Sequence, residues 1–228
     1  MFKSRIAAIA VAISAIASVP ASADTLKEAI AKDMPSLMEI YKDLHQNPEL
    51  SFQEFRTAKK LADEARRLGF TVTEKVGKTG VVAVLTNGSG PTVMLRADMD
   101  GLPVDEQTGL SYSSKTRGTS KAGVETGIMH ACGHDTHMTG WVAAARQLAA
   151  NKDKWSGRLM LIGQPAEERG PGASAMMDDN LWQTFGQPDY AFAFHVDAGS
   201  EAGKITVDEG SPYAGADTVD IIVFHKLF

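Results

Sequence analysis

The first third of the chain carries two helical hydrophobic patterns. Apolar residues recur at helical spacing over residues 26–44 and again over residues 55–68, which predicts two amphipathic helices. Pro35 marks either the true start of the first helix or a kink within it. Ser51, with Glu54 three residues later, predicts a capping box at the start of the second helix.

The rest of the chain alternates between strand-like and helical patterns. Short apolar runs predict strands at residues 70–76, 81–85, 92–97, 159–163 and 190–194. Helical patterns cover residues 135–150 and about 172–182, and a long loop containing Gly and Ser fills residues 99–129. Strands that alternate with helices indicate an α/β fold, with a mainly parallel sheet flanked by helices.

The N-terminal segment, residues 1–23, departs from this globular pattern. Basic Lys3 and Arg5 precede an apolar run, which ends in a small-x-small sequence at Ala23. This pattern predicts a signal peptide that is cleaved after Ala23, and therefore a periplasmic or secreted protein. A retained N-terminal membrane anchor is the alternative, although the apolar run is short for a bilayer.

Composition and charge narrow the classes of function. The 228 residues are 43% hydrophobic and 22% charged, which is ordinary for a globular protein. The net charge of -5, without a run of Lys or Arg, argues against nucleic acid as a partner. No stretch after the signal peptide is apolar enough to cross a membrane. The single cysteine, Cys132, excludes an internal disulfide.

Four polar segments stand where strands end or a helix begins. They are residues 96–103, residues 129–137, residues 164–168 and His195. Ligands of open α/β sheets collect outside the carboxyl ends of the strands, so we expect these segments to meet at one rim. Together they offer a thiolate, imidazoles and carboxylates, a set of ligands that suits zinc and its neighbours.

The thiol and the imidazoles have alternative interpretations. A lone cysteine is usually inert packing, but Cys132 lies in a polar, His-rich loop, which favours metal ligation. His134 is two residues further on, so both side chains can reach one ion from a loop. His130 and His137 are weaker candidates, either for supporting a ligand or for the surface.

The acidic residues are also ambiguous when taken singly. The pair Glu167-Glu168 would be ordinary on a solvated face, but it directly follows a predicted buried strand. Asp98 and Asp100 either cap a turn or orient a ligand histidine.

Five ordered motifs make the chain resemble the M20 family of metallopeptidases, in its amidohydrolase branch. This branch includes hippurate hydrolases and auxin-conjugate hydrolases. The matching motifs are residues 45–51, 96–103, 129–137, 164–168 and 195–196. The resemblance covers roughly residues 26–223, and it is specific because all five motifs occur in order.

This resemblance implies a catalytic domain with two divalent metal ions, which are Zn, Mn, Co or Ni. The metal ligands that it implies are Cys132, His134, Glu168 and His195. It also implies that Glu167 is the general base and that Asp100 is an acidic residue that supports the site. The family's last metal-binding histidine lies beyond Phe228.

The resemblance also implies a smaller inserted domain for dimerisation and for closing over substrate. We expect the catalytic α/β domain at residues 24–213 and the first part of this lid or dimerisation domain at residues 214–228. Residues 218–224 alternate like a strand that has just begun before the sequence stops, so we interpret the chain as a truncated product.

The sequence therefore predicts an enzyme that cleaves the amide bond of N-acyl amino acids, such as hippurate, with a metal-activated water. The expected partners are a small amide substrate and, in the full-length form, a second copy in a homodimer. The alternatives are an exported metallo-aminopeptidase or carboxypeptidase of the same fold, and an inactive truncated remnant.

Overall fold

The structure, a computed structural model, describes residues 23–207. By its internal contacts the chain divides into two units, Met1–Val196 and Asp197–Phe228, and every described helix and strand belongs to the first. The predicted signal peptide, apart from its last residue, and the predicted second domain from residue 214 lie outside the described residues. Of the helices in the described part, none is long and apolar enough to span a membrane.

A five-stranded sheet forms the centre of the first unit, in the order β1-β2-β6-β3-β7. The strands are β1 (Thr71–Val76), β2 (Gly80–Asn87), β3 (Thr92–Asp98), β6 (Gly157–Gln164) and β7 (Tyr190–Ala193). β3 is parallel to β6 and β7, whereas β2 is antiparallel to β1 and β6. The sheet is therefore mixed, because the tight connection between β1 and β2 imposes antiparallel pairing that apolar runs alone do not reveal.

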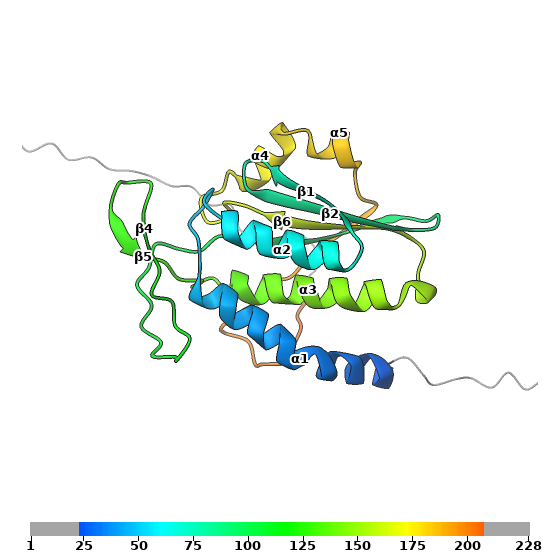
Figure 1. Cartoon of the computed structure of the whole chain (residues 1–228), viewed down its shortest axis with the longest axis horizontal. Coiled ribbons are helices and arrows are strands. Elements are labelled where there is room, and N and C mark those ends of the chain that lie inside the picture. The colour runs from blue at the N-terminus through cyan, green and yellow to red at the C-terminus, as the bar shows by residue number, and fades with distance from the viewer. Residues whose placement is uncertain (1–22, 208–228) are drawn as a thin grey trace, which may run out of the picture. The chain divides into compact units, whose positions relative to one another are not determined.

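Helices cover both faces of the sheet, which confirms the predicted α/β class (Figure 1). On one side lie α1 (Ala23–Gln46), α2 (Phe55–Arg67) and α3 (His134–Ala150), and on the other lie α4 (Gly172–Asp178) and α5 (Leu181–Phe185). α1 continues through Pro35, so the proline does not start it. The predicted loop contains a small hairpin of β4 (Arg117–Thr119) and β5 (Glu125–Gly127), and a 3-10 turn (Lys152–Lys154) follows α3.

The sheet has a hydrophobic core on each face, because the side chains of β2 and β6 alternate between the two faces. On one face, Val81, Ala83, Leu159 and Leu161 pack with buried residues of α1, α2 and α3. On the other face, Val82, Met160 and Ile162 pack with Met176 of α4 and Leu181 of α5. Successive residues of a strand point to opposite faces, so strands covered on both sides appear in the sequence as continuous apolar runs.

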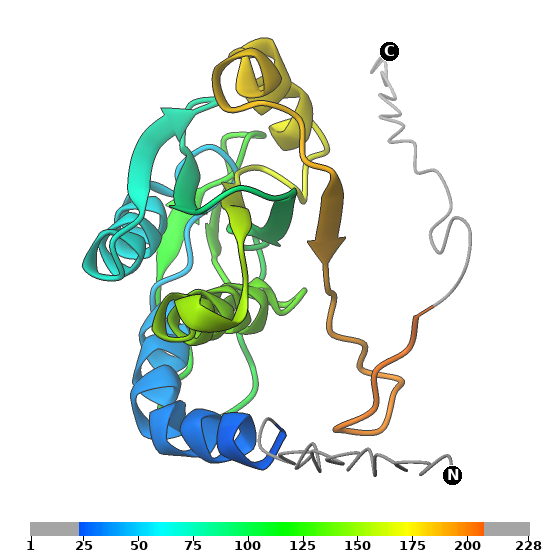
Figure 2. The same ribbon diagram turned by 90° about the vertical axis from the view of Figure 1, so that its right-hand side faces the viewer.

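The polar residues at the ends of the parallel strands lie at one edge of the sheet. β3 and β6 end together, with Asp98 opposite Gln164, and β7 runs beside β3 in the same direction at the outer edge of the sheet (Figure 2). α3 begins at the same place, because Nε2 of its first residue, His134, lies 3.6 Å from Oδ2 of Asp98. The four polar segments therefore meet, as the strand pattern predicts.

Candidate metal centre

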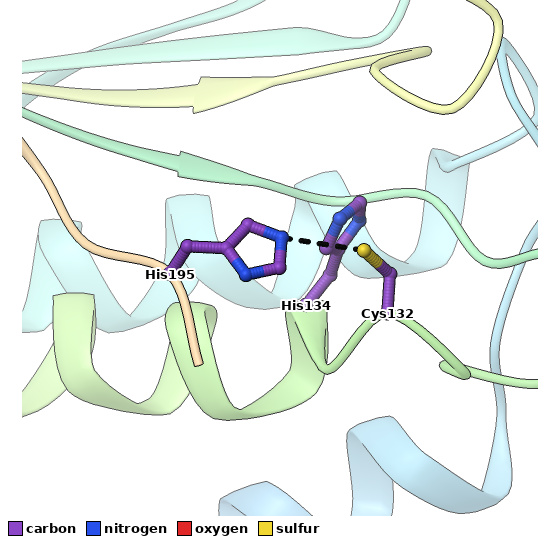
Figure 3. A group of neighbouring side chains, drawn as sticks. All are labelled: Cys132, His134 and His195. Carbon is purple, nitrogen blue, oxygen red and sulfur yellow. Dashed lines mark hydrogen bonds between the residues drawn. The ribbon is translucent and has the colours of Figure 1, made fainter. Parts of the chain in front are cut away.

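The turn before α3 places two donor side chains on the same side of the chain. Gly133 caps the helix in a left-handed conformation, with φ of 84°. A Cβ at this position would lie 2.4 Å from Cγ2 of Val196, so a larger residue would force this side chain to shift and would also be strained by the backbone conformation. Cys132 and His134 stand on either side of this glycine and point toward His195 (Figure 3).

Cys132, His134 and His195 form the first group of donors. Their ligand atoms all lie within 4.8 Å of one another, and Sγ of Cys132 is 3.3 Å from Nε2 of His195. Nδ1 of His195 donates to the carbonyl of Val196, so Nε2 carries the lone pair that faces the thiol.

The acidic pair that follows β6 supplies a second group around the same histidine. Nε2 of His134 lies 3.7 Å from Oε2 of Glu167 and 3.6 Å from Oε1 of Glu168. The side chain of Glu168 is 15% exposed and that of Glu167 is 38% exposed. The more buried carboxylate therefore suits a ligand, and the more exposed one can reach a bound molecule.

Unpartnered buried atoms show that this set of residues fits a divalent cation. Nδ1 of His134 donates to the backbone carbonyl of Asp100 at 2.7 Å, which leaves Nε2 directed at the cluster. Nε2 is buried without a hydrogen-bond partner, and so is Oε1 of Glu168. Buried polar atoms normally have partners, and a thiol, two imidazoles and carboxylates are the donors that zinc and similar ions prefer.

His137 lies close to this cluster, but both of its ring nitrogens already form hydrogen bonds. Its Nδ1 donates to Oδ1 of Asp98 at 2.7 Å, and its Nε2 accepts the N–H of Val196 at 3.0 Å. Burial acts to raise the pKa of Asp98, but the bond from His137 and the positive charge of His134 outweigh it and lower the pKa to about 2. His137 therefore links the segment after β7 to Asp98 at the end of β3.

Asp100 is not one of the converging donors, but it supports them through hydrogen bonds. Its side chain accepts the backbone N–H groups of Glu167 and Glu168 at 3.0 and 3.1 Å, and its backbone carbonyl orients His134. Ser51 donates its hydroxyl to the same carboxylate at 2.5 Å. The predicted capping box is therefore wrong: the side chain of Glu54, the N-cap of α2, makes no cap hydrogen bond, and Ser51 binds Asp100. The N–H groups of Arg56 and Thr57 in the first turn donate instead to Glu49, at 3.0 and 2.8 Å.

Two further histidines, His130 and His45, are buried but lie outside the cluster. His130 is 4% exposed and its ring nitrogens have no hydrogen-bond partner, but it belongs to none of the groups of converging donor atoms. His45 bridges Asp135 and Glu106 through its two ring nitrogens, at 2.6 and 3.1 Å. The motif at residues 45–51 marks His45 in the sequence, but no local pattern indicates these partners.

The protons on the donor atoms lead to a prediction for cation binding. Burial and the negative charges of Glu168 and Glu167 raise the pKa of the Cys132 thiol to about 12. Burial acts to lower the pKa of His134, but the hydrogen bond with Asp100 and the charges of Asp98 and Asp100 raise it to about 9. Since a ligand must be deprotonated, we expect Zn²⁺ binding near neutral pH to release one proton from each residue.

Titration calorimetry in buffers of different ionisation enthalpy measures this release. Apparent affinity should rise about tenfold per pH unit for each proton released. Replacing Cys132 with serine should reduce the number of released protons, and a binding heat that is independent of the buffer would contradict the assignment of these two ligands.

Comparison with known proteins finds matches to one family of hydrolases. The sequence profile described as peptidase family M20/M25/M40 matches residues 94–223. The chain is 41% identical over 184 residues to the hippurate hydrolase of Campylobacter jejuni, covering 80% of this chain and 45% of that protein. It is 38% identical over 207 residues to thermostable carboxypeptidase 1 of Saccharolobus solfataricus, covering 89% of this chain and 50% of that protein.

A solved structure also matches the fold. It is the YXEP protein of Bacillus subtilis, described as a dinuclear metal-binding peptidase of the M20 family. The match has a TM-score of 0.63 at 33% identity, and it covers 75% of this chain and 44% of that chain. The chain thus spans about half the length of the relatives that it matches.

Proposed function

This chain belongs to peptidase family M20/M25/M40, and from that premise we propose that it carries part of a two-metal centre for hydrolysing the amide bond of N-acyl amino acids. The observation that supports the proposal best is the convergence of Cys132, His134, Glu168 and His195, with Glu167 beside them. Hydrolysis by this M20-type arrangement requires both a cation site and a free carboxylate, and the cluster offers both.

The roles of the side chains follow from their exposure and partners. Cys132, His134, Glu168 and His195 would hold the cations, which supply a Lewis acid that polarises a carbonyl and acidifies water. Glu167 takes a proton from the attacking water and passes it to the leaving amide nitrogen. Asp100 holds the backbone of Glu167 and so directs this carboxylate.

A peptidase of the same fold is the alternative that the similarity to a carboxypeptidase keeps open. The thiol favours the amidohydrolase, because the resemblance that places Cys132 among the ligands is to the amidohydrolase branch.

A panel of substrates separates the two candidates, and a count of bound cations tests the metal centre. We expect the chain loaded with Zn²⁺, Mn²⁺, Co²⁺ or Ni²⁺ to release glycine from N-benzoylglycine faster than it cleaves dipeptides. Faster cleavage of dipeptides would favour the peptidase. Failure to hold two cations per chain, with no hydrolysis of either substrate class, would contradict the proposed function.

Export is a separate proposal that rests on the N-terminal sequence. The basic, apolar and small-residue segments of residues 1–23 support cleavage after Ala23. Sequencing of the N-terminus of the protein recovered from outside the cytoplasm should give Asp24 as the first residue, and an intact Met1 in that fraction would contradict cleavage.

A further inference from the structure

Three successive backbone N–H groups in the turn after β6 are bound by buried carboxylates. We call residues 165–168 the acidic turn. Asp100 binds the N–H groups of Glu167 and Glu168, and the N–H of Ala166 donates to Oε1 of Glu54 at 2.8 Å. Glu54 lies 112 residues earlier in the chain, directly before α2. The direction of the two glutamates thus depends on a segment remote from them in sequence.

The acidic turn has a backbone conformation that needs external support. Ala166 has φ of 46°, in the left-handed region that is strained for a residue with a Cβ. The turn also closes tightly, because a Cβ at Gly172 would lie 1.5 Å from the carbonyl oxygen of Pro165. Such conformations persist where surrounding contacts determine them, and the bond from Ala166 to Glu54 is a contact of this kind.

Glu54 is an unusual residue to find in this position. Its side chain is fully buried, and Thr79 donates its hydroxyl to Oε2 at 2.5 Å. Burial raises the pKa of this carboxyl, while the donors that act against the shift are neutral: the Thr79 hydroxyl and backbone N–H groups. Burying a carboxyl with neutral partners costs stability. Helix capping does not account for it, since the side chain of Glu54 makes no cap hydrogen bond to α2 and Glu49 binds the N–H groups of the first turn.

We propose that Glu54 is a positioning residue, which fixes the acidic turn by binding the N–H of Ala166 and so directs Glu167 and Glu168 toward His134. The consequence for catalysis rests on the proposed function. The structural part does not, because it concerns the backbone of the turn and its readiness to bind a cation.

Three variants of the 228-residue chain separate positioning from general stability. Glu54→Met keeps the length of the side chain but removes the acceptor, whereas Glu54→Gln keeps an oxygen that can accept the N–H of Ala166. Glu64→Gln is the matched control, because Glu64 is also a buried carboxylate of α2 but pairs with Arg146. The measurements are amide hydrogen exchange by NMR in the cation-free protein and Zn²⁺ affinity by chelator competition.

We expect Glu54→Met to accelerate exchange of the Ala166 amide, while the amides of Leu161 and Ile162 in β6 stay protected. Zn²⁺ affinity should fall by about 10- to 100-fold, as for other residues that orient a metal ligand. Glu54→Gln should restore both properties, and Glu64→Gln should change neither. Unchanged exchange and affinity in a folded Glu54→Met variant would overturn the proposal, as would Glu54→Gln behaving like Glu54→Met.

If Glu54→Met does not fold, Thr79→Val provides the test, because it removes one donor from the carboxyl without touching the acidic turn. Faster exchange at Ala166 in Thr79→Val supports positioning, and unchanged exchange contradicts it. Hydrolysis is not needed for either measurement. A native chain that binds Zn²⁺ and cleaves no amide would therefore contradict the proposed function and leave this inference standing.

Discussion

Replacing Glu167 with glutamine is expected to lower the rate of amide hydrolysis by about 10²- to 10⁴-fold, the usual contribution of a general acid–base residue. Glutamine cannot take the proton from water, but it keeps the backbone N–H that Asp100 binds. Because Glu167 is the more exposed member of the acidic pair, we expect Zn²⁺ affinity to change much less than kcat. Initial rates with N-benzoylglycine and a parallel count of bound Zn²⁺ measure the two effects.

Glu125→Gln is a suitable control for this prediction. Glu125 lies on β5, its side chain is 73% exposed, and its partner is Arg117, outside the cluster. It should hydrolyse N-benzoylglycine at the native rate. Native kcat in Glu167→Gln would show that a different group moves the proton.

Replacing His134 with alanine should abolish cation binding. His134 is common to both groups of donors described above and to a third, which it forms with Asp98 and His137, and its Nε2 is buried without a hydrogen-bond partner. We expect the affinity for Zn²⁺ to fall by more than about 100-fold, beyond the 10- to 100-fold that is typical of residues that only orient a ligand. Chelator competition measures this loss, and hydrolysis should disappear with it.

The same substitution should alter how the stability of the cation-free protein depends on pH. The pKa of His134 in the folded protein is raised from 6.5 to about 9. Since the folded state holds this proton more tightly than the unfolded chain, its stabilisation is complete below pH 6.5 and is lost as the pH rises through about 9. The Tm of the native protein should therefore decline over that range more steeply than that of His134→Ala.

His130→Leu is the matched control for the loss of a buried imidazole. His130 forms no hydrogen bond through its ring, and burial lowers its pKa to about 4, so the ring is neutral at the pH of the assay. Its removal should leave Zn²⁺ affinity unchanged. Native affinity in His134→Ala, or a large loss in His130→Leu, would require a different set of ligands.

The sequence predicts the rim of the sheet well because strand ends are local features. The apolar runs before Asp98, Glu167 and His195 end where the structure ends β3, β6 and β7, within a few residues. Parallel strands then bring those ends together without further information. The direction of β1 and β2 and the β4–β5 hairpin are not evident from apolar runs, because short turns and exposed strands leave little hydrophobic signal.

The supporting contacts could not be predicted from the sequence, because they join distant segments. The spacing of Ser51 and Glu54 matches a capping box, but their side chains bind Asp100 and Ala166, which are 49 and 112 residues away. His137 likewise has the chemistry of a ligand, and only its bonds to Asp98 and Val196 show that it is occupied. Local spacing describes local structure, whereas tertiary packing decides these partners.

The outer strand β7 has a consequence for handling the protein in solution. Tyr190 and Phe192 are each 59% exposed, and within residues 23–207 no strand pairs with the far side of β7. An edge strand that exposes aromatic side chains tends to associate with other copies of the protein. The apparent molar mass from light scattering should therefore increase with protein concentration, and less so in a Phe192→Lys variant, so dilute samples are the appropriate material for calorimetry and NMR.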